Sequence, residues 1–226
     1  MSRAAIQFLV LVALGLAILL ALLGWATIRS NLLGWFLLIA GSIYFFGIVI
    51  VYWVRRIRFW RPRAERKMVK EERDDWSFWF IVTGMIAAFY SPPLEYLFFP
   101  AVILRSIGMQ VAGLSGIALG SVLFIWARRV LGQFYSGHVS VIEGQHLVQH
   151  GPYHFLRHPA YAGYILIALG LALGFSSLTG FGVILFLLLP SVIYRMSVED
   201  RLLAEHFSTQ FTEYARKTKR LIPGIW

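Results

Sequence analysis

Long apolar runs separated by short polar stretches dominate the hydropathy pattern of this chain. The first two cover residues 4–28 and 32–54, and the first contains no charged residue. A helix needs about 20 apolar residues to cross the roughly 30 Å hydrocarbon core of a bilayer. Further runs cover residues 76–90, 107–127, 161–175 and 181–194. The pattern therefore predicts an all-α polytopic integral membrane protein with about six transmembrane helices.

Proline and glycine positions predict where several of these helices end. The third run stops at Ser91, Pro92 and Pro93. Paired prolines lack amide donors and disfavour helical backbone in the preceding residue, so we expect the helix to end there. Residues 94–104 are too short to span and are predicted to be interfacial or re-entrant. Residues 176–180, Ser-Ser-Leu-Thr-Gly, predict a tight hairpin between the last two spans.

The basic residues predict the orientation of the chain in the membrane. Of 21 Lys and Arg, 18 fall in residues 55–75, 128–160 and 195–226, which six spans place on one side. Cytoplasmic loops of membrane proteins carry the excess of Lys and Arg. We therefore expect both termini and the polar segments to be cytoplasmic. The first run is longer than the apolar region of a cleaved signal peptide and is interpreted as a retained span.

The formal charge of +10 changes this picture little, because most of the basic residues border membrane helices. Such residues attract anionic lipid headgroups, so membrane lipids are expected partners and nucleic acid is not. Residues 55–75 also hold five acidic residues and resemble a solvated linker. The chain has no cysteine, which excludes disulfides and thiolate chemistry. Its six histidines lack HExxH spacing, so no metal site is expected.

Candidate chemistry is concentrated in residues 128–160 and 195–226, which the predicted hairpin brings together on one side of the membrane. Neither segment contains a GxSxG elbow, a P-loop or a GxGxxG fingerprint. A membrane transferase, a membrane reductase and a protein without catalytic activity remain as candidates. A transporter is expected to carry polar residues at mid-depth, whereas here they gather at the ends of the spans.

Three ordered motifs resemble those of one known family. The first is QHLVQHGPY from Gln145, followed by RHPAYAG from Arg157. The second is RMSVED from Arg195, and the third is the closing tail from Phe207 to Pro223, ending in RLIP. Together with LGQFYS before them, they are similar to the isoprenylcysteine carboxyl methyltransferase family and its prokaryotic relatives. The resemblance implies membrane spans in residues 1–105 and a methyltransferase-like catalytic region in residues 106–226.

The resemblance also implies S-adenosylmethionine as the cofactor. It assigns to the cofactor site His138, Gln145, His146, Leu147, Val148, Tyr153, His158, Pro159, Ala160, Tyr161 and Glu199. The residue types suit such a ligand, because apolar side chains wall an adenine and tyrosines offer an aromatic face with a hydroxyl. Pro159 also suits the first turn of the helix that follows. His138 is equally explained as a surface histidine, and Gly163 by close helix packing.

Arg195 and Glu199 are the candidate catalytic pair. They are four residues apart, which places them on one face of a helix, and a structural salt bridge would also explain them. In the family that the motifs resemble, the arginine meets the substrate and the glutamate meets the cofactor. Arg157 is open to three interpretations: countering a carboxylate, capping a helix or binding a lipid headgroup. The chain departs from the family pattern at Asp200, where a second Glu is common, and at Ser208, where Gly is common.

The predicted function is that of an integral membrane S-adenosylmethionine-dependent methyltransferase with a lipophilic or small acceptor. The family name implies the carboxylate of a prenylated cysteine, while small thiols and phospholipid amines are alternative acceptors. A sterol-type reductase using NADPH and a non-enzymatic scaffold or transporter are the competing hypotheses. The sequence leaves the oligomeric state open.

Overall fold

The computed structural model describes residues 3–57, 68–71, 75–99, 105–135 and 139–222. Its helices are α1 (Arg3–Thr27), α2 (Leu33–Ile57), α3 (Asp75–Phe98), α4 (Ile107–Leu131), α5 (Pro159–Gly174), α6 (Leu178–Val183) and α7 (Leu189–Lys217). A π-helical turn, Ile184–Leu188, makes α6 and α7 continuous. The predicted all-α membrane class is confirmed. The described residues add one short two-stranded sheet.

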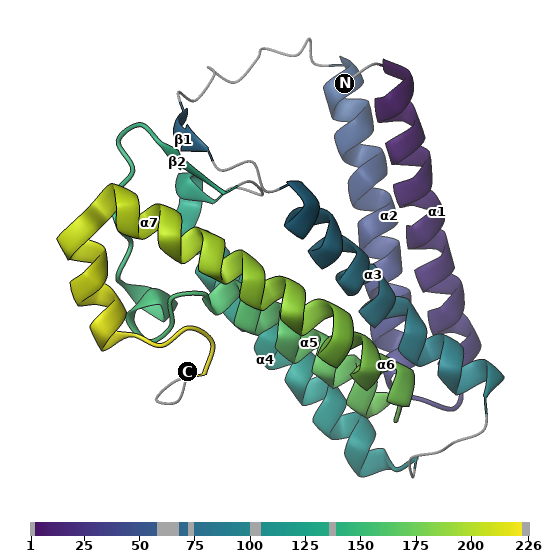
Figure 1. The fold of residues 1–226 in the computed structure, drawn as a ribbon. Coiled ribbons are helices and arrows are strands. Elements are labelled where there is room, and N and C mark those ends of the chain that lie inside the picture. Colours follow the sequence, from purple (N-terminus) through teal and green to yellow (C-terminus); the bar gives the residue numbers. More distant parts are fainter. Residues whose placement is uncertain (1–2, 58–67, 72–74, 100–104, 136–138, 223–226) are drawn as a thin grey trace.

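Four helical segments are long and apolar enough to cross a bilayer: Val10–Thr27, Ser77–Phe98, Ile107–Phe134 and Leu178–Lys217. The described apolar part of α2, Leu33–Ile43, and α5 are shorter. At 1.5 Å per residue α5 is about 24 Å long, which falls short of the hydrocarbon core. The count of six spans therefore stays a prediction. Figure 1 shows α1 and α2 packed side by side, with α4, α5 and α7 forming a second layered group beyond α3.

The prediction that the third helix ends at Ser91 is wrong. Helix α3 continues through Pro92 and Pro93 to Phe98, so residues 94–98 of the expected interfacial segment are helical. Both proline side chains are fully buried, and the Cγ of Pro92 lies beside Gly180 of α6. Prolines are tolerated inside membrane helices where neighbouring helices cover them. Residues 100–104 lie outside the described part of the chain.

Glu95, which follows the two prolines, fixes the turn between α5 and α6. Its carboxylate accepts hydrogen bonds from the Ser177 hydroxyl at 2.6 Å and from the Thr179 amide at 2.8 Å. The Ser177 hydroxyl also accepts from the Gly180 amide at 2.9 Å, which caps α6. These contacts satisfy amide groups that a helix start leaves without internal partners. The predicted hairpin is confirmed, although its second helix begins at Leu178 and runs well past residue 194.

Glycines hold α4 and α5 in close contact. Gly120 of α4 faces Gly163 of α5, and Gly113 of α4 faces Gly170 of α5. The second pair lies seven residues before the first on α4 and seven residues after it on α5. A Cβ on Gly163 would lie 2.7 Å from the Gly120 carbonyl oxygen, and one on Gly170 would lie 2.5 Å from that of Gly113. Small residues allow membrane helices to approach this closely. Helix packing therefore explains Gly163.

The two strands join segments that are far apart in the sequence. Strand β1 (Met68–Glu71) pairs antiparallel with β2 (Ser140–Ile142). Val139 and Val141 then pack on Val198 and Leu202, so β2 lies against the middle of α7. The sequence predicted a linker at residues 55–75, and residues 58–67 and 72–74 of it lie outside the described part.

Helix α7 bends sharply at Ser208, where φ is 45° and ψ is −113°. Beyond the bend the chain turns back, as Figure 1 shows, and Tyr214 donates a hydrogen bond to the Tyr153 carbonyl at 2.8 Å. This backbone region is open to glycine and costs other residues about 1–3 kcal/mol. The strained turn therefore positions the tail of the chain against the segment that contains Tyr153.

We expect Ser208→Gly to stabilise the protein by about 1 kcal/mol, because glycine adopts this backbone without strain. The thermal midpoint in detergent should rise by about 2–4 °C. Gln210→Gly, at an exposed helical position after the bend, is the control and should lower the midpoint. Equal destabilisation by both glycines would contradict the account of the bend.

Candidate active site

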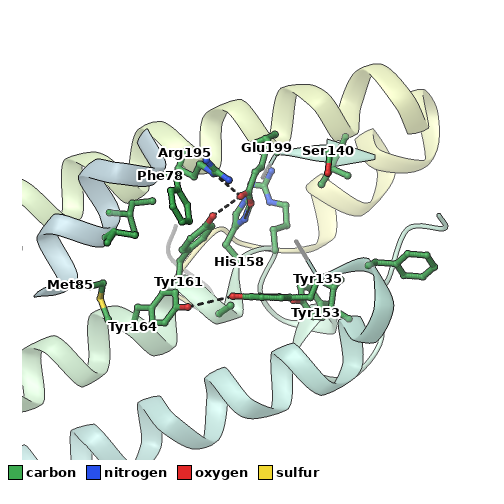
Figure 2. Close-up of a pocket in the computed structure, with 18 of the residues that line it drawn as sticks. Phe78, Met85, Tyr135, Ser140, Tyr153, His158, Tyr161, Tyr164, Arg195 and Glu199 are labelled. Atoms are coloured by element: carbon green, nitrogen blue, oxygen red, sulfur yellow. Dashed lines mark hydrogen bonds and ion pairs between the residues drawn. The ribbon is translucent and has the colours of Figure 1, made fainter. Parts of the chain in front are cut away.

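A cavity of about 760 Å³ opens between the N-terminal helices and the C-terminal group. Its polar end is lined by Tyr135, Ser140, Gln145, His146, Tyr153, Arg157, His158, Tyr161, Tyr164, Arg195 and Glu199. Its apolar end is lined by side chains of α1, α2 and α3: Leu16, Leu20, Ala40, Phe78, Ile81, Val82, Met85, Ile86 and Phe89. One cavity thus joins a charged region to a hydrocarbon-like region, and Figure 2 shows its polar end.

The structure brings most of the predicted site residues to this cavity. Its wall includes Gln145, His146, Leu147, Val148, Tyr153, His158, Ala160, Tyr161, Arg195 and Glu199. Pro159 is different: it is buried at the first position of α5 and does not line the cavity. Its role in the described structure is to start the helix, as its ring favours. His138 lies outside the described residues.

Local backbone geometry explains how the wall is built. Gly151 has a φ of +62°, and a Cβ there would lie 3.0 Å from the Val130 side chain of α4. Only glycine fits such a turn without strain. The turn leads into the short 3₁₀ helix Gly151–His154, in which Tyr153 is buried. His158 then occupies the N-cap of α5, with Tyr161 in the first turn of that helix.

His158 is a buried link between α5 and α7. Its side chain is 5% exposed, and its Nε2 lies 2.9 Å from Asp200 Oδ1 while its Nδ1 lies 3.4 Å from Glu199 Oε2. Burial alone lowers the pKa of a histidine, but hydrogen bonds and charge from Asp200 and Glu199 outweigh it and raise the pKa of His158 above its ordinary value. Each ring nitrogen faces a carboxylate oxygen, and a protonated ring would donate to both.

Glu199 joins His158 to Tyr161 and Arg195. It accepts a hydrogen bond from the Tyr161 hydroxyl at 2.5 Å and one from Arg195 Nε at 3.3 Å. Arg195 is 3% exposed and also donates from Nη1 to Ser77 of α3 at 3.2 Å. The predicted salt bridge is therefore present, yet both of its residues line the cavity. The catalytic and structural interpretations of the pair coexist in this geometry.

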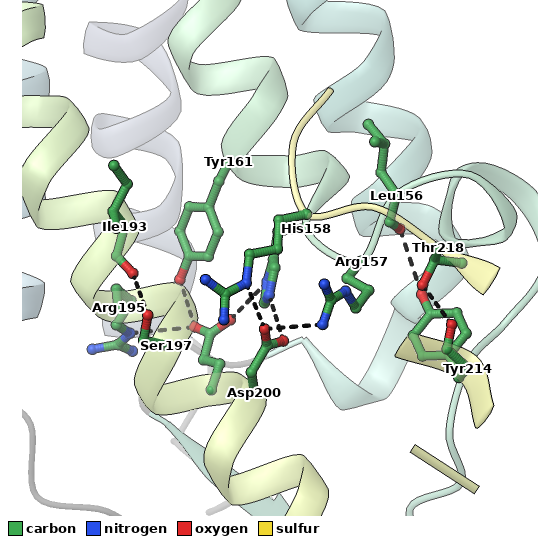
Figure 3. Close-up of polar contacts among 12 residues, drawn as sticks. Leu156, Arg157, His158, Tyr161, Ile193, Arg195, Ser197, Asp200, Tyr214 and Thr218 are labelled. Carbon is green, nitrogen blue, oxygen red and sulfur yellow. Dashed lines mark hydrogen bonds and ion pairs between the residues drawn. The ribbon is translucent and has the colours of Figure 1, made fainter. Parts of the chain in front are cut away.

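Asp200, which the sequence left undecided, has three cationic partners. Besides His158, its carboxylate meets Arg157 Nη1 at 3.2 Å and Arg220 Nε at 3.0 Å. Figure 3 shows Arg157 and His158 converging on Asp200 from the segment that precedes α5. The motif around Arg195 contained Asp200, but nothing in its spacing indicated partners 43 and 20 residues away. The described partner of Arg157 is thus Asp200, and its predicted roles toward a cofactor carboxylate, a helix end or a lipid headgroup stay predictions.

Several residues in or beside the cavity carried little signal in the sequence: Tyr135 appeared only within the LGQFYS segment, and Tyr164, Phe78 and Ser77 in none of the motifs. Tyr135 and Tyr164 have hydroxyl oxygens 3.5 Å apart, and Arg128 lies over the Tyr135 ring at 4.9 Å. Phe78 and the neighbouring Ser77 come from α3, far from the matching motifs. A tyrosine or phenylalanine in an apolar run does not by itself indicate a functional site, because aromatic residues are expected in any membrane helix.

The polar end fits S-adenosylmethionine, the cofactor that the motifs implied. The Nε of Arg157 is buried and has no hydrogen-bond partner among the described residues, although the side chain lines the cavity. A buried donor of this kind is costly unless a ligand completes it, and a carboxylate would do so. Glu199 offers an anion for a cationic ligand group, and the tyrosines offer aromatic walls.

Comparison with known proteins finds methyltransferases and one metal-resistance protein. The family model for phospholipid methyltransferases matches residues 109–210. The cobalt-zinc-cadmium resistance protein CzcN of Cupriavidus metallidurans is 34% identical over 116 residues, 50% of this chain and 48% of that protein. Protein-S-isoprenylcysteine O-methyltransferase B of Arabidopsis thaliana is 26% identical over 136 residues, 58% of this chain and 67% of that protein. The matches thus span about half to two thirds of these relatives.

The fold has a counterpart among solved structures. The eukaryotic intramembrane Ras methyltransferase, an isoprenylcysteine carboxyl methyltransferase, superposes with a TM-score of 0.58 and 22% sequence identity. The superposition covers 94% of this chain and 74% of that one. The membrane helices α1 to α3, which lie outside the matched family model, are therefore included in the shared fold.

The raised pKa of His158 predicts a pH-dependent stability. A histidine whose pKa is higher in the folded than in the unfolded state stabilises fully below about pH 6.5 and loses that effect as pH rises through its folded pKa. We expect the stability advantage of the wild type over His158→Gln to be largest near pH 6 and to shrink toward pH 9. Thermal midpoints across this range measure it, with exposed His150→Gln as the control. An advantage that grows with pH would contradict the imidazolium assignment.

Proposed function

We propose, from the similarity of this chain to isoprenylcysteine carboxyl methyltransferases and to phospholipid methyltransferases, that it transfers a methyl group from S-adenosylmethionine to a lipophilic acceptor. The observation that carries the proposal is the single cavity, charged at one end and apolar at the other. A soluble acceptor needs no passage between membrane helices. An acceptor with a hydrocarbon tail needs both environments at once.

The cofactor would be held at the polar end. Arg157 offers a buried donor for its carboxylate, Glu199 an anion for its positive charge, and Tyr153 and Tyr161 aromatic surfaces. When bound there, S-adenosylmethionine supplies a methyl group activated by a sulfonium centre. Leu147 and Val148 add apolar contact on the same wall. The contribution of the chain is to align this group with the acceptor and to exclude water from both.

The charge of the cavity wall favours an acceptor with an anionic head. Arg157, His158 and Arg195 line it with positive charge, and Glu199 is the one acidic residue among the described lining residues. Arg195 would orient a carboxylate or thiolate through its planar guanidinium, while Tyr161 and Ser77 hold the Arg195 and Glu199 side chains in place. Direct attack on the methyl carbon by an anion, with the carbon–sulfur bond electrons leaving to sulfur, requires no general base.

The apolar end would hold the tail of the acceptor. Helices α1, α2 and α3 supply this part of the wall, and α3 contributes Val82 and Met85. The prenylated cysteine carboxylate named for two of the similar proteins fits this combination of anionic head and hydrocarbon tail. The phospholipid methyltransferase match makes a lipid amine the competing acceptor.

We further infer that the polar end of the cavity faces the cytoplasm. The support is the distribution of basic residues, of which 18 of 21 lie in the segments on that side of a six-span arrangement. The same reasoning places both termini in the cytoplasm. The division into N-terminal spans (1–105) and a catalytic region (106–226) belongs to this proposal, and the matched residues 109–210 fall within the second part.

Calorimetry on the purified protein in lipid nanodiscs tests the cofactor. We expect S-adenosylmethionine and S-adenosylhomocysteine to bind and NADPH not to bind. Glu199→Gln should weaken S-adenosylmethionine binding about tenfold, because a charged contact contributes more than a neutral one. Exposed Glu213→Gln removes the same charge from the same helix and should leave affinity unchanged. Binding of NADPH without binding of either methionine ligand would favour the reductase hypothesis instead.

A panel of acceptors matched in tail length tests the substrate class. We expect methyl transfer to lipophilic carboxylates or thiolates and little transfer to the corresponding amines. Val82→Phe should raise KM about tenfold for long-tailed acceptors by filling the apolar end, with cofactor affinity unchanged. Thr83→Phe, on the exposed face of α3, is the matched control. Faster transfer to amines, or equal KM values in both variants, would contradict the proposal.

A further inference from the structure

The C-terminal strap, residues 218–222, lies against the segment that precedes α5. The Arg157 amide donates to the Lys219 carbonyl at 2.7 Å, and the His158 amide donates to the Arg220 carbonyl at 3.1 Å. The Lys219 amide donates back to the Phe155 carbonyl at 3.3 Å. Leu156 and Lys219 form a parallel bridge. The strap therefore pairs with the backbone of two residues whose side chains line the cavity, Arg157 and His158.

Asp200 connects this strap to helix α7 from behind the cavity wall. It is 10% exposed and does not line the cavity, whereas Arg157 and His158 do. Its Oδ1 faces His158, and its Oδ2 faces both Arg157 and Arg220. One carboxylate thus holds the two wall residues and the strap at the same time. A second strap contact comes from Thr218, whose hydroxyl donates to the Tyr214 carbonyl at 2.8 Å.

The arrangement leaves part of Arg157 for a ligand. Asp200 engages Nη1, and the Nε is buried without a hydrogen-bond partner among the described residues. A mobile arginine side chain loses conformational entropy when it binds a ligand, which weakens binding. A side chain already held in one rotamer loses less entropy and so binds more tightly. A carboxylate behind the wall fixes Arg157 before the ligand arrives. The same carboxylate fixes the ring orientation of His158.

We propose that Asp200 is a positioning residue that locks the C-terminal strap, through Arg220, onto the cavity wall and sets Arg157 and His158 for cofactor binding. The proposal rests on the proposed function only in naming the cofactor. Arg220 is 28% exposed, and its Nε donates to Asp200 Oδ2 at 3.0 Å, so its side chain acts on the wall through Asp200. The effects of the two residues on ligand affinity should therefore not add.

Calorimetry with S-adenosylhomocysteine tests this role in Asp200→Asn, Arg220→Gln and the double variant. We expect affinity to fall about tenfold in Asp200→Asn and about threefold in Arg220→Gln, with the double variant within about twofold of Asp200→Asn. Asp200→Glu keeps the charge and should stay within about threefold of the wild type. Exposed Arg216→Gln and Glu213→Gln are matched controls for the lost charges and should change nothing.

A merely structural role gives another pattern. Thermal midpoints would fall in Asp200→Asn and Arg220→Gln while affinity, measured well below those midpoints, stayed at the wild-type value. That result, or additive losses in the double variant, overturns the proposal. If Asp200→Asn does not fold, Arg220→Gln alone tests the proposal. A threefold loss of ligand affinity in that variant supports it, and an unchanged affinity overturns it.

Titration with NADPH separates the two hypotheses. A wild type that binds NADPH and not S-adenosylhomocysteine contradicts the proposed function. In that case, the predicted fold-changes in affinity between variants, now measured with NADPH, would still support the positioning role. A folded wild type that binds neither ligand contradicts both.

Discussion

Two adjacent carboxylates on one membrane helix, Glu199 and Asp200, hold this structure's polar half together. An unpaired carboxylate taken out of water costs several kcal/mol, so each requires cationic partners. His158 bridges the two, Arg195 pairs with Glu199, and Arg157 and Arg220 pair with Asp200. Because these partners come from α7, the segment before α5 and the C-terminal strap, the pair fixes the relative placement of all three. Buried ion pairs add little to the net free energy of folding, because apolar residues of equal volume in their place often give a protein that is equally stable. Their main effect here is on geometry.

The apolar half provides the frame that makes this polar cluster possible. Glycines on α4 and α5 bring those helices together, and the Glu95 contact fixes the turn from which the long helix toward Glu199 begins. Helix α3 then closes the other side of the cavity and contributes Ser77 to Arg195. Membrane helices gain little from burying apolar surface against each other, so close backbone approach and buried hydrogen bonds decide their arrangement. The cavity lies where these two modes of packing meet.

The sequence predicted the features that depend on local pattern. The runs of apolar residues predicted the membrane class, which is confirmed. The motifs around His158 and Arg195 lie within the residues that the phospholipid methyltransferase model matches. The sequence missed what depends on partners far along the chain. Pro92 and Pro93 end helices in water, but here α6 covers them and α3 continues. Strand β1 lies in a charged stretch without a strand pattern, and it forms because β2 is available to pair. The partners of Asp200 could not be predicted either, because Arg157 and Arg220 lie far from it in the sequence.

The central claim is that the polar end of the cavity, walled by Arg157, His158, Tyr161 and Glu199, binds the methyl donor beside an apolar site for the acceptor. The most direct measurement is an experimental structure of the protein in lipid nanodiscs with S-adenosylhomocysteine bound. The account predicts ligand density in this cavity, with its carboxylate at Arg157 and its sulfur facing the apolar end. Ligand bound elsewhere on the chain, or in the opposite orientation with its sulfur turned away from Arg195 and the apolar end, would contradict it.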